Sequence, residues 1–410
     1  MASSILHIKD SFYFEVPKVL LHSHRESRKD FPAFWTRLDE DYQLWEAGRQ
    51  LDALAALKPG VAGESLSIAD MPARGELFSQ YKLWRSEHSN FAKPFDAFLE
   101  TADSQEWFQS QLGGEVAQQQ WRTIKEEAED VEQYLSSTPE WSAEKILEYN
   151  HQLDGKILIP QPFGQIKNLY QGESGFTISK FMIIELVVAV VIAASFIWLA
   201  KRLRSGDRPQ GKRQNMFEAV LLYFRDEIVR PVIGGKEADR FVPLLWTLFL
   251  FILGLNLAGM IPFVGAPTGS FGTTLGLAIV TFGTGLTFGM QKFGPIGFWT
   301  NQVPSMGLPW YMAIVIVPMI FAIEILGMFI KHAVLGVRLL ANMVAGHLVL
   351  LAVMGLAVAA AGSSTWGLTA SIAVVGSALF SCLELFVAFL QAYIFTFLSA
   401  LFIGMAIHHH

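Results

Sequence analysis

The sequence predicts an all-α protein with about five to six membrane helices, the last two of them long and tilted, and an extramembrane helical N-terminal domain. Only 17% of the 410 residues are charged, whereas soluble domains carry roughly a quarter. The charge is also uneven, because residues 1–180 hold 18 Lys/Arg and 28 Asp/Glu while residues 241–410 hold five charged side chains. Long apolar stretches fill the same C-terminal part. A soluble fold does not need so little charge over such a length, so this part is expected to lie in a membrane.

The first 180 residues have a different, soluble character. We expect an N-terminal interfacial segment at 1–25, a soluble helical insert on the outer side at 26–160, a connector at 161–180 and a membrane domain at 181–410. The acidic balance of residues 1–180 argues against a nucleic-acid partner, since phosphate binding needs clustered basic side chains. The single cysteine, Cys382, excludes a disulfide framework within the chain.

The insert shows helical rather than strand periodicity. Apolar residues recur at helical spacing from Phe34 to Leu54, and three to five amphipathic helices are expected. Asp103 with Glu106, and Ser137 with Glu140, have the spacing of a capping box at a helix start. The Trp and Phe residues of the insert are interpreted as core or docking contacts, and no cofactor or metal is expected.

Five apolar stretches are long enough to cross a membrane. The expected spans are 182–200, 241–263, 273–290, 318–361 and 366–407. Ten Lys/Arg lie between residues 201 and 240, and the positive-inside rule therefore puts this segment in the cytoplasm and the N-terminal domain outside.

The last two spans exceed 40 residues each, which corresponds to about 60 Å of helix, twice the thickness of the hydrocarbon core. They must be strongly tilted or broken, and we expect a tilted hairpin.

Ionisable residues follow defined faces of this hairpin. Glu324, Lys331 and Arg338 are seven residues apart and form one stripe, which Asn342 continues. His347 lies on the opposite face of the same helix. On the second helix, Glu384 and Gln391 share a face. A membrane arginine persists only beside a carboxylate or a wet cavity, and a facing His and Glu can bind and release protons. Structural pairing of Arg338 with Glu384 or Glu324 is the simpler alternative, and Lys331 and His332 are interpreted as interfacial side chains.

The stretch GVRLLANMVAGHLVL at 336–350 resembles the signature helix of subunit a of rotary ATP synthases, in which an Arg-Leu pair precedes an Asn, an Ala-Gly pair and an ionisable residue. LELFVAFLQAYIF at 383–395 is similar to the last helix of that family, and NLAGMIP at 256–262 to the end of its second span. The start HIKDSFYFEVP at 7–17 resembles its N-terminus. The insert departs from the usual pattern of the family, and no motif in it names a partner.

The resemblance implies a non-catalytic, proton-translocating stator subunit with two offset half-channels. Arg338 matches the arginine that faces the carboxylates of the rotor c-ring, and Glu324 matches a position of the inner half-channel. The positions that match the outer half-channel are Asn342, His347, Glu384 and Gln391. The implied partners are the c-ring, the peripheral stalk subunits and membrane lipid. The chain itself has no GxxxxGK[ST] phosphate loop for nucleotide chemistry.

The implied location is the bacterial inner (plasma) membrane, with the N-terminal domain on the periplasmic side, or alternatively the mitochondrial inner membrane. The competing function is a self-contained ion channel or secondary transporter with an intramembrane Arg site. A transporter of that kind often has inverted repeats, and no repeat is visible between the spans.

Overall fold

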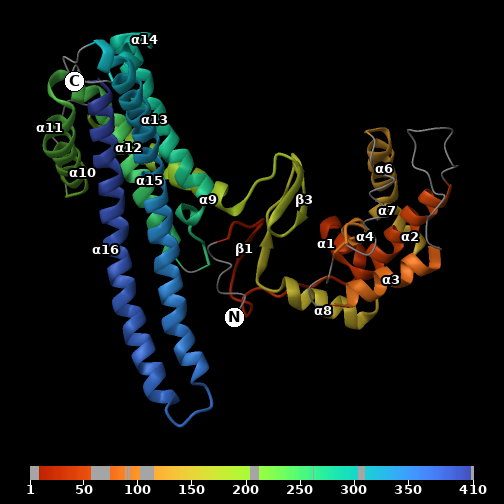
Figure 1. The fold of residues 1–410 in the computed structure, drawn as a ribbon. Coiled ribbons are helices and arrows are strands. Elements are labelled where there is room, and N and C mark those ends of the chain that lie inside the picture. The colour runs from red at the N-terminus through yellow and green to blue at the C-terminus, as the bar shows by residue number, and fades with distance from the viewer. Residues whose placement is uncertain are drawn as a thin grey trace. The chain divides into compact units, whose positions relative to one another are not determined.

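The computed structural model describes residues 9–56, 74–87, 90, 93–101, 115–203, 212–261, 263–302 and 310–407. Two compact units share the chain. The N-terminal unit comprises Val16–Lys156 and Gln161–Thr177, and the membrane unit comprises the described residues before Val16, Ile157–Pro160 and those from Ile178 onward. Helices dominate both units, which confirms the all-α fold class (Figure 1).

The N-terminal unit contains more and shorter helices than the sequence predicts. Its described α-helices are α1 (Ala33–Leu38), α2 (Glu40–Ala56), α3 (Arg74–Ser86), α4 (Phe95–Leu99), α6 (Glu115–Ala128), α7 (Val131–Ser137) and α8 (Ala143–Leu153). A short 3-10 helix, η2 (Arg28–Asp30), precedes them. The antiparallel hairpin of β3 (Gly164–Asn168) and β4 (Gln171–Gly175) occupies the expected connector, where no strand was predicted. The main core of the unit is formed by α2, α3, α4 and α6 around Leu51, Tyr81 and Phe98.

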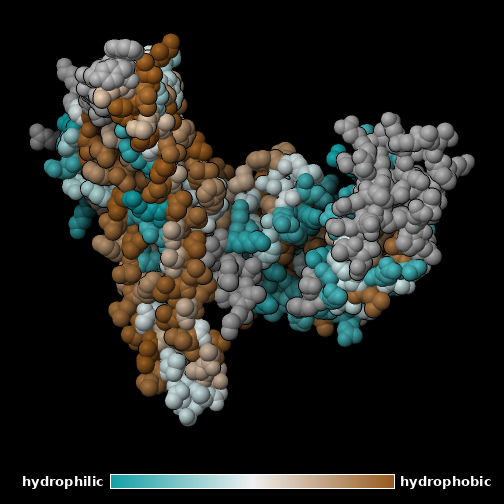
Figure 2. Space-filling view, viewed as in Figure 1, coloured by the Kyte–Doolittle hydropathy of each residue, from teal (hydrophilic) through white to brown (hydrophobic). Residues whose placement is uncertain are grey.

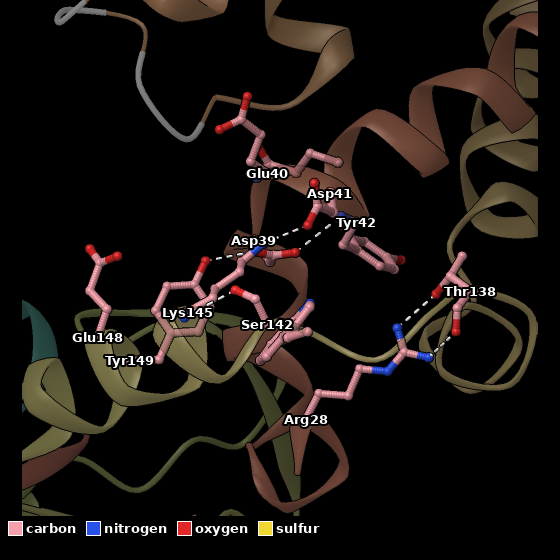
Figure 3. Close-up of polar contacts among 12 residues, drawn as sticks. Arg28, Asp39, Glu40, Asp41, Tyr42, Thr138, Ser142, Lys145, Glu148 and Tyr149 are labelled. Carbon is pink, nitrogen blue, oxygen red and sulfur yellow. Dashed lines mark hydrogen bonds and ion pairs between the residues drawn. The ribbon is translucent and has the colours of Figure 1, made fainter. Parts of the chain in front are cut away.

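The helix start predicted at Ser137 is wrong. Ser137 ends α7, and α8 begins after Ser142, whose side chain accepts a hydrogen bond from the Lys145 amide. The reason is that Arg28, only 1% exposed, donates to the carbonyl oxygens of Leu135, Thr138 and Pro139 and so satisfies the free C-terminal end of α7. Figure 3 shows the contact of Arg28 with Thr138. The other expected capping box, Asp103 with Glu106, lies outside the described residues.

A buried carboxylate connects the junction of α1 and α2 with α8 in the N-terminal unit. Asp39 interrupts the helical pattern between α1 and α2 in an extended conformation. Its Oδ1 lies 2.6 Å from Lys145 Nζ and accepts a hydrogen bond of 2.5 Å from the Tyr149 hydroxyl, both on α8 (Figure 3). Burial and the neighbouring Asp39 raise the pKa of Tyr149 well above its usual value, so it remains a hydroxyl donor. Asp39 is therefore paired across more than 100 residues of sequence.

The membrane unit has five helices long and apolar enough to span a bilayer within the described residues. They are α9 (Lys180–Leu203), α12 (Gly235–Gly259), α13 (Phe271–Phe293), α15 (Trp310–Ala359) and α16 (Trp366–Ile407). The shorter elements are β1 (Tyr13–Glu15), β2 (Lys156–Leu158), α10 (Lys212–Tyr223), the π-helix η4 (Phe224–Val229), α11 (Arg230–Ile233), the 3-10 helix η5 (Pro267–Gly269) and α14 (Pro295–Thr300). Lys292 is in the last turn of α13 and pairs with Glu237 at 3.1 Å.

The long hairpin of α15 and α16 is continuous in both arms, which lie side by side (Figure 1). Gly362 has a φ of 86° in the loop that joins the arms, a conformation that favours glycine. Most of the visible surface of the hairpin is apolar, whereas hydrophilic residues gather on the N-terminal unit (Figure 2). Leu335 and Leu339 of α15 pack with Ala392 and Phe395 of α16, and this contact holds the polar residues of the two helices against each other.

Candidate functional site

Arg338 lies near the middle of α15 and is half-buried. It forms no hydrogen bond or ion pair with any residue that the structure describes. Glu324, which is 14 residues earlier on the same helix, lies about 21 Å away along the helix axis. The simpler alternative, in which Arg338 pairs with Glu324 or Glu384 to hold the bundle together, is therefore wrong. A guanidinium cannot lose its proton, so this side chain presents a permanent charge with no neutralising group on the hairpin.

A small cavity with three polar side chains of the hairpin in its wall lies on the C-terminal side of Arg338 along α15. Asn342 of α15 donates a hydrogen bond of 2.7 Å to Gln391 of α16. These two side chains and Glu384 line a cavity of about 20 Å³, called here the Glu384 cavity. A space of that size holds roughly one water molecule. The structure thus brings together three of the residues predicted from the sequence.

Glu384 is held close to the backbone of α15. Its side chain is 8% exposed, and its Oε1 has no hydrogen-bond partner among the described residues. A Cβ atom at Gly346 would lie 2.6 Å from this oxygen, so any larger residue here would push the end of the Glu384 side chain out of its present position. His347 follows Gly346 and is half-buried. The small residue next to the predicted histidine therefore shapes the carboxyl site.

A larger cavity lies on the N-terminal side of Arg338. It has a volume of about 170 Å³, called here the Glu324 cavity, and its walls come from α13, α14, α15 and α16. Glu324, Lys331 and His332 are its ionisable lining residues among those described. Its α16 wall lies at the end of that helix, where Ala400, Ile403 and Ile407 pack on η4 and α11. The Glu324 cavity is therefore at the same end of the membrane unit as η4 and α11, which belong to the C-terminal part of the basic segment 201–240.

Two polar contacts of the membrane unit were not predicted from the sequence. Asn256 of α12 is 4% exposed, lines the Glu384 cavity and donates to the Ala388 carbonyl oxygen at 3.2 Å. Thr281 of α13 and Ser399 of α16 are fully buried with their hydroxyl oxygens 3.2 Å apart. The available signal was a polar residue within an apolar span, which must find a partner in the absence of water.

Comparison with known proteins agrees with this arrangement. The model of the family described as ATP synthase A chain matches residues 182–404. The chain belongs to this family. The matched region contains Arg338, the Glu384 cavity and all but two lining residues of the Glu324 cavity. The fold class and the family resemblance predicted from the sequence are confirmed.

Three relatives illustrate the similarity. The chain is 36% identical over 250 residues to ATP synthase subunit a of Myxococcus xanthus, a match covering 60% of this chain and 79% of the relative. It is 34% identical over 265 residues to ATP synthase subunit a 2 of Chlorobaculum tepidum, covering 63% and 72%. It is 37% identical over 265 residues to ATP synthase subunit a of an Anaeromyxobacter species, covering 64% and 60%. The family model begins after the N-terminal unit, so it says nothing of the insert.

Proposed function

We propose that this chain is the proton-conducting stator subunit of a membrane ATP synthase and that it couples proton flow to rotation of a c-ring. The observation that carries the proposal is Arg338, which has no ion-pair partner among the described residues and lies along α15 between two separate cavities, each lined by a carboxyl group. Membership of the ATP synthase A chain family supports it. ATP synthesis itself then belongs to other subunits of the complex, including those that the peripheral stalk connects to this chain.

The geometry supports two offset half-channels. In the proposed outer path, protons reach a ring carboxylate by way of His347, Glu384, Asn342 and Gln391. The protonated carboxylate is neutral, so it can rotate into lipid. After nearly a full turn the ring carboxylate meets the inner path at Glu324 and releases its proton.

Arg338 separates the two paths electrostatically. Its fixed charge lowers the pKa of whichever ring carboxylate faces it, because the ionised form is favoured beside a cation. That carboxylate stays ionised as it passes between the paths. A proton therefore cannot cross from one cavity to the other without rotation of the ring.

The charge distribution supports an orientation. The Glu324 cavity and the C-terminal part of the basic segment lie at the same end of the membrane unit. Basic segments beside membrane spans face the cytoplasm. We therefore place the Glu324 cavity on the cytoplasmic side of a bacterial inner membrane and the N-terminal unit on the periplasmic side.

Replacement of Arg338 tests the proposal. Membrane vesicles carrying Arg338→Ala are expected to lose ATP synthesis driven by an imposed proton gradient, with assembly of the complex checked by co-purification of the c-ring. Arg338→Lys serves as a comparison that keeps the charge but loses the planar guanidinium. Retention of proton-driven synthesis in Arg338→Ala would exclude the proposed role of this residue.

A further inference from the structure

His332 occupies a position in the Glu324 cavity that differs from the interfacial one predicted from the sequence. It is only 9% exposed and lines the cavity together with Glu324. Along α15 it lies about 12 Å from Glu324 and about 9 Å from Arg338, so its depth is between the two. A snorkelling side chain would instead reach away from the protein toward the membrane surface.

Two aromatic rings fix the orientation of the imidazole. The ring of Phe282 on α13 packs edge-on against the imidazole, with the two ring centroids 5.1 Å apart. The ring centroid of Phe402 on α16 lies 4.8 Å from that of the imidazole. The Nδ1 atom is 2.8 Å from the Met328 carbonyl oxygen. A carbonyl oxygen can only accept, so Nδ1 must carry the hydrogen. In the neutral ring, Nε2 then keeps its lone pair and is the atom that can accept a proton.

Nε2 has no hydrogen-bond partner among the described residues. The cavity that His332 lines has a volume of about 170 Å³, which is enough for several water molecules. Proton transfer over the distance to Glu324 could then proceed through water, as in other chains of hydrogen bonds.

The other charged groups around the cavity are few. Glu324 and Lys331 are on the same helix as His332, and Lys331 is exposed. The described lining residues of α13, α14 and α16, and Gln302, carry no ionisable group. Arg338 lies about 9 Å away along the same helix and Glu324 about 12 Å away, so the imidazole has a fixed cation on one side and a carboxylate on the other. An imidazole titrates in the range in which a cytoplasmic proton path must work.

We propose that His332 is a proton-relay residue of the inner path, accepting at Nε2 the proton released by a ring carboxylate and passing it to Glu324. The step conserves its atoms: a carboxylic acid becomes a carboxylate, the imidazole becomes an imidazolium, and the same proton then moves through water to the Glu324 carboxylate. Nδ1 keeps its hydrogen on the Met328 carbonyl throughout. The inference rests on the proposed function and adds to it a named carrier between the level of Arg338 and Glu324.

The test compares two substitutions in the assembled complex. His332→Phe keeps an aromatic ring between Phe282 and Phe402 but cannot bind a proton, and His332→Gln keeps a polar side chain that does not titrate near neutrality. Thr284→Val is the matched control, because Thr284 is on α13, bonds its hydroxyl to the Val280 carbonyl and does not line the cavity. The measurement is potential-driven proton flux in vesicles from which the catalytic part of the complex has been removed. Flux is normalised to the amount of co-purified c-ring and recorded from pH 5.5 to 8.5 on the Glu324 side.

Both His332 variants are expected to lower the flux at pH 7 by about tenfold or more, a modest loss for an acid-base group. Both should also remove the change in flux that titration of the imidazole gives the parent complex within this pH range. Flux and pH profile equal to the parent in His332→Phe would show that the ring only packs, and would overturn the proposal. Arg338→Ala in vesicles that keep the catalytic part separates the outcomes: if it abolishes proton-driven ATP synthesis while His332→Phe behaves as the parent in both assays, the relay fails and the proposed function stands.

Discussion

Gly346 provides a sharp test of the geometry at Glu384. A Cβ atom at this position would lie 2.6 Å from Glu384 Oε1 and 3.1 Å from Cδ, whereas ordinary contact begins at 3.4 Å. In Gly346→Ala the oxygen must therefore retreat by about 0.8 Å, the difference between 3.4 and 2.6 Å. The carboxyl group would move into a cavity of only about 20 Å³ and displace the single water that fits there. A misplacement of about 1 Å in a reacting group can lower a rate about a hundredfold, so we expect proton-driven ATP synthesis to fall by about ten- to a hundredfold.

Gly355→Ala is the matched control on the same helix. A Cβ atom there would meet nothing within 4 Å, and alanine is about 1 kcal/mol more favourable than glycine inside a helix. The control is expected to assemble and synthesise ATP as the parent does. The assay is synthesis in membrane vesicles under an imposed proton gradient, normalised to assembled complex. Equal rates for Gly346→Ala and Gly355→Ala would refute the idea that the close approach of Glu384 to α15 matters for conduction.

The remaining predictions concern the outer path and the N-terminal unit. The double variant His347→Glu with Glu384→His is expected to recover more proton-driven ATP synthesis than either single variant, since the pair keeps its chemistry; equal loss in all three would contradict a functional pair. Asp39→Asn is expected to destabilise the N-terminal unit by about 2 kcal/mol, because it removes the charge of a fully buried acceptor bonded to Lys145 and Tyr149, and Asp41→Asn, at an exposed carboxylate, by less than about 1 kcal/mol; protection from hydrogen exchange in α2 and α8 measures both. Burial, reinforced by nearby acidic groups, raises the pKa of Glu46 from 4.5 to about 7, so folding favours its protonated form and the unit should lose stability as pH rises from about 4.5 to 7, by up to about 3 kcal/mol. Glu46→Gln should remove this loss and be the more stable form at pH 8, and a parent-like pH dependence in the variant would count against it.

The sequence predicted the membrane part well because its signals are local. The expected span 366–407 coincides with α16, since Gly362 and the polar residues after it end one apolar stretch and begin another. The expected start of the preceding span at Pro318 is eight residues late, because the apolar run continues upstream to Trp310 and α15 accommodates the proline in its interior. Local pattern was therefore sufficient for the existence of these helices and less so for their boundaries.

Contacts between distant residues were beyond the same reasoning. Helical spacing placed Glu324 and Arg338 on one stripe, but it could not show that Arg338 has no carboxylate partner on the hairpin. The depth of His332 depends on Phe282 and Phe402, which come from two other helices. The break at Asp39 likewise depends on α8, more than 100 residues later in the chain. Each case is set by packing between elements rather than by propensity within one.

The length of α15 bears on how its polar residues can work together. A 50-residue helix is about 75 Å long, and it fits a hydrocarbon core of about 30 Å only if it is tilted by roughly 65°. Glu324 and Asn342 are separated by 18 residues, or about 27 Å along the helix. In an upright helix this separation would put them near opposite faces of the core, but at such a tilt their depths differ by only about 11 Å. Both cavities then lie close to the depth of Arg338 and are displaced mainly sideways, in the plane of the membrane. A carboxylate carried past on a rotating ring stays at one depth, so a tilted helix lets the same carboxylate meet each cavity in turn.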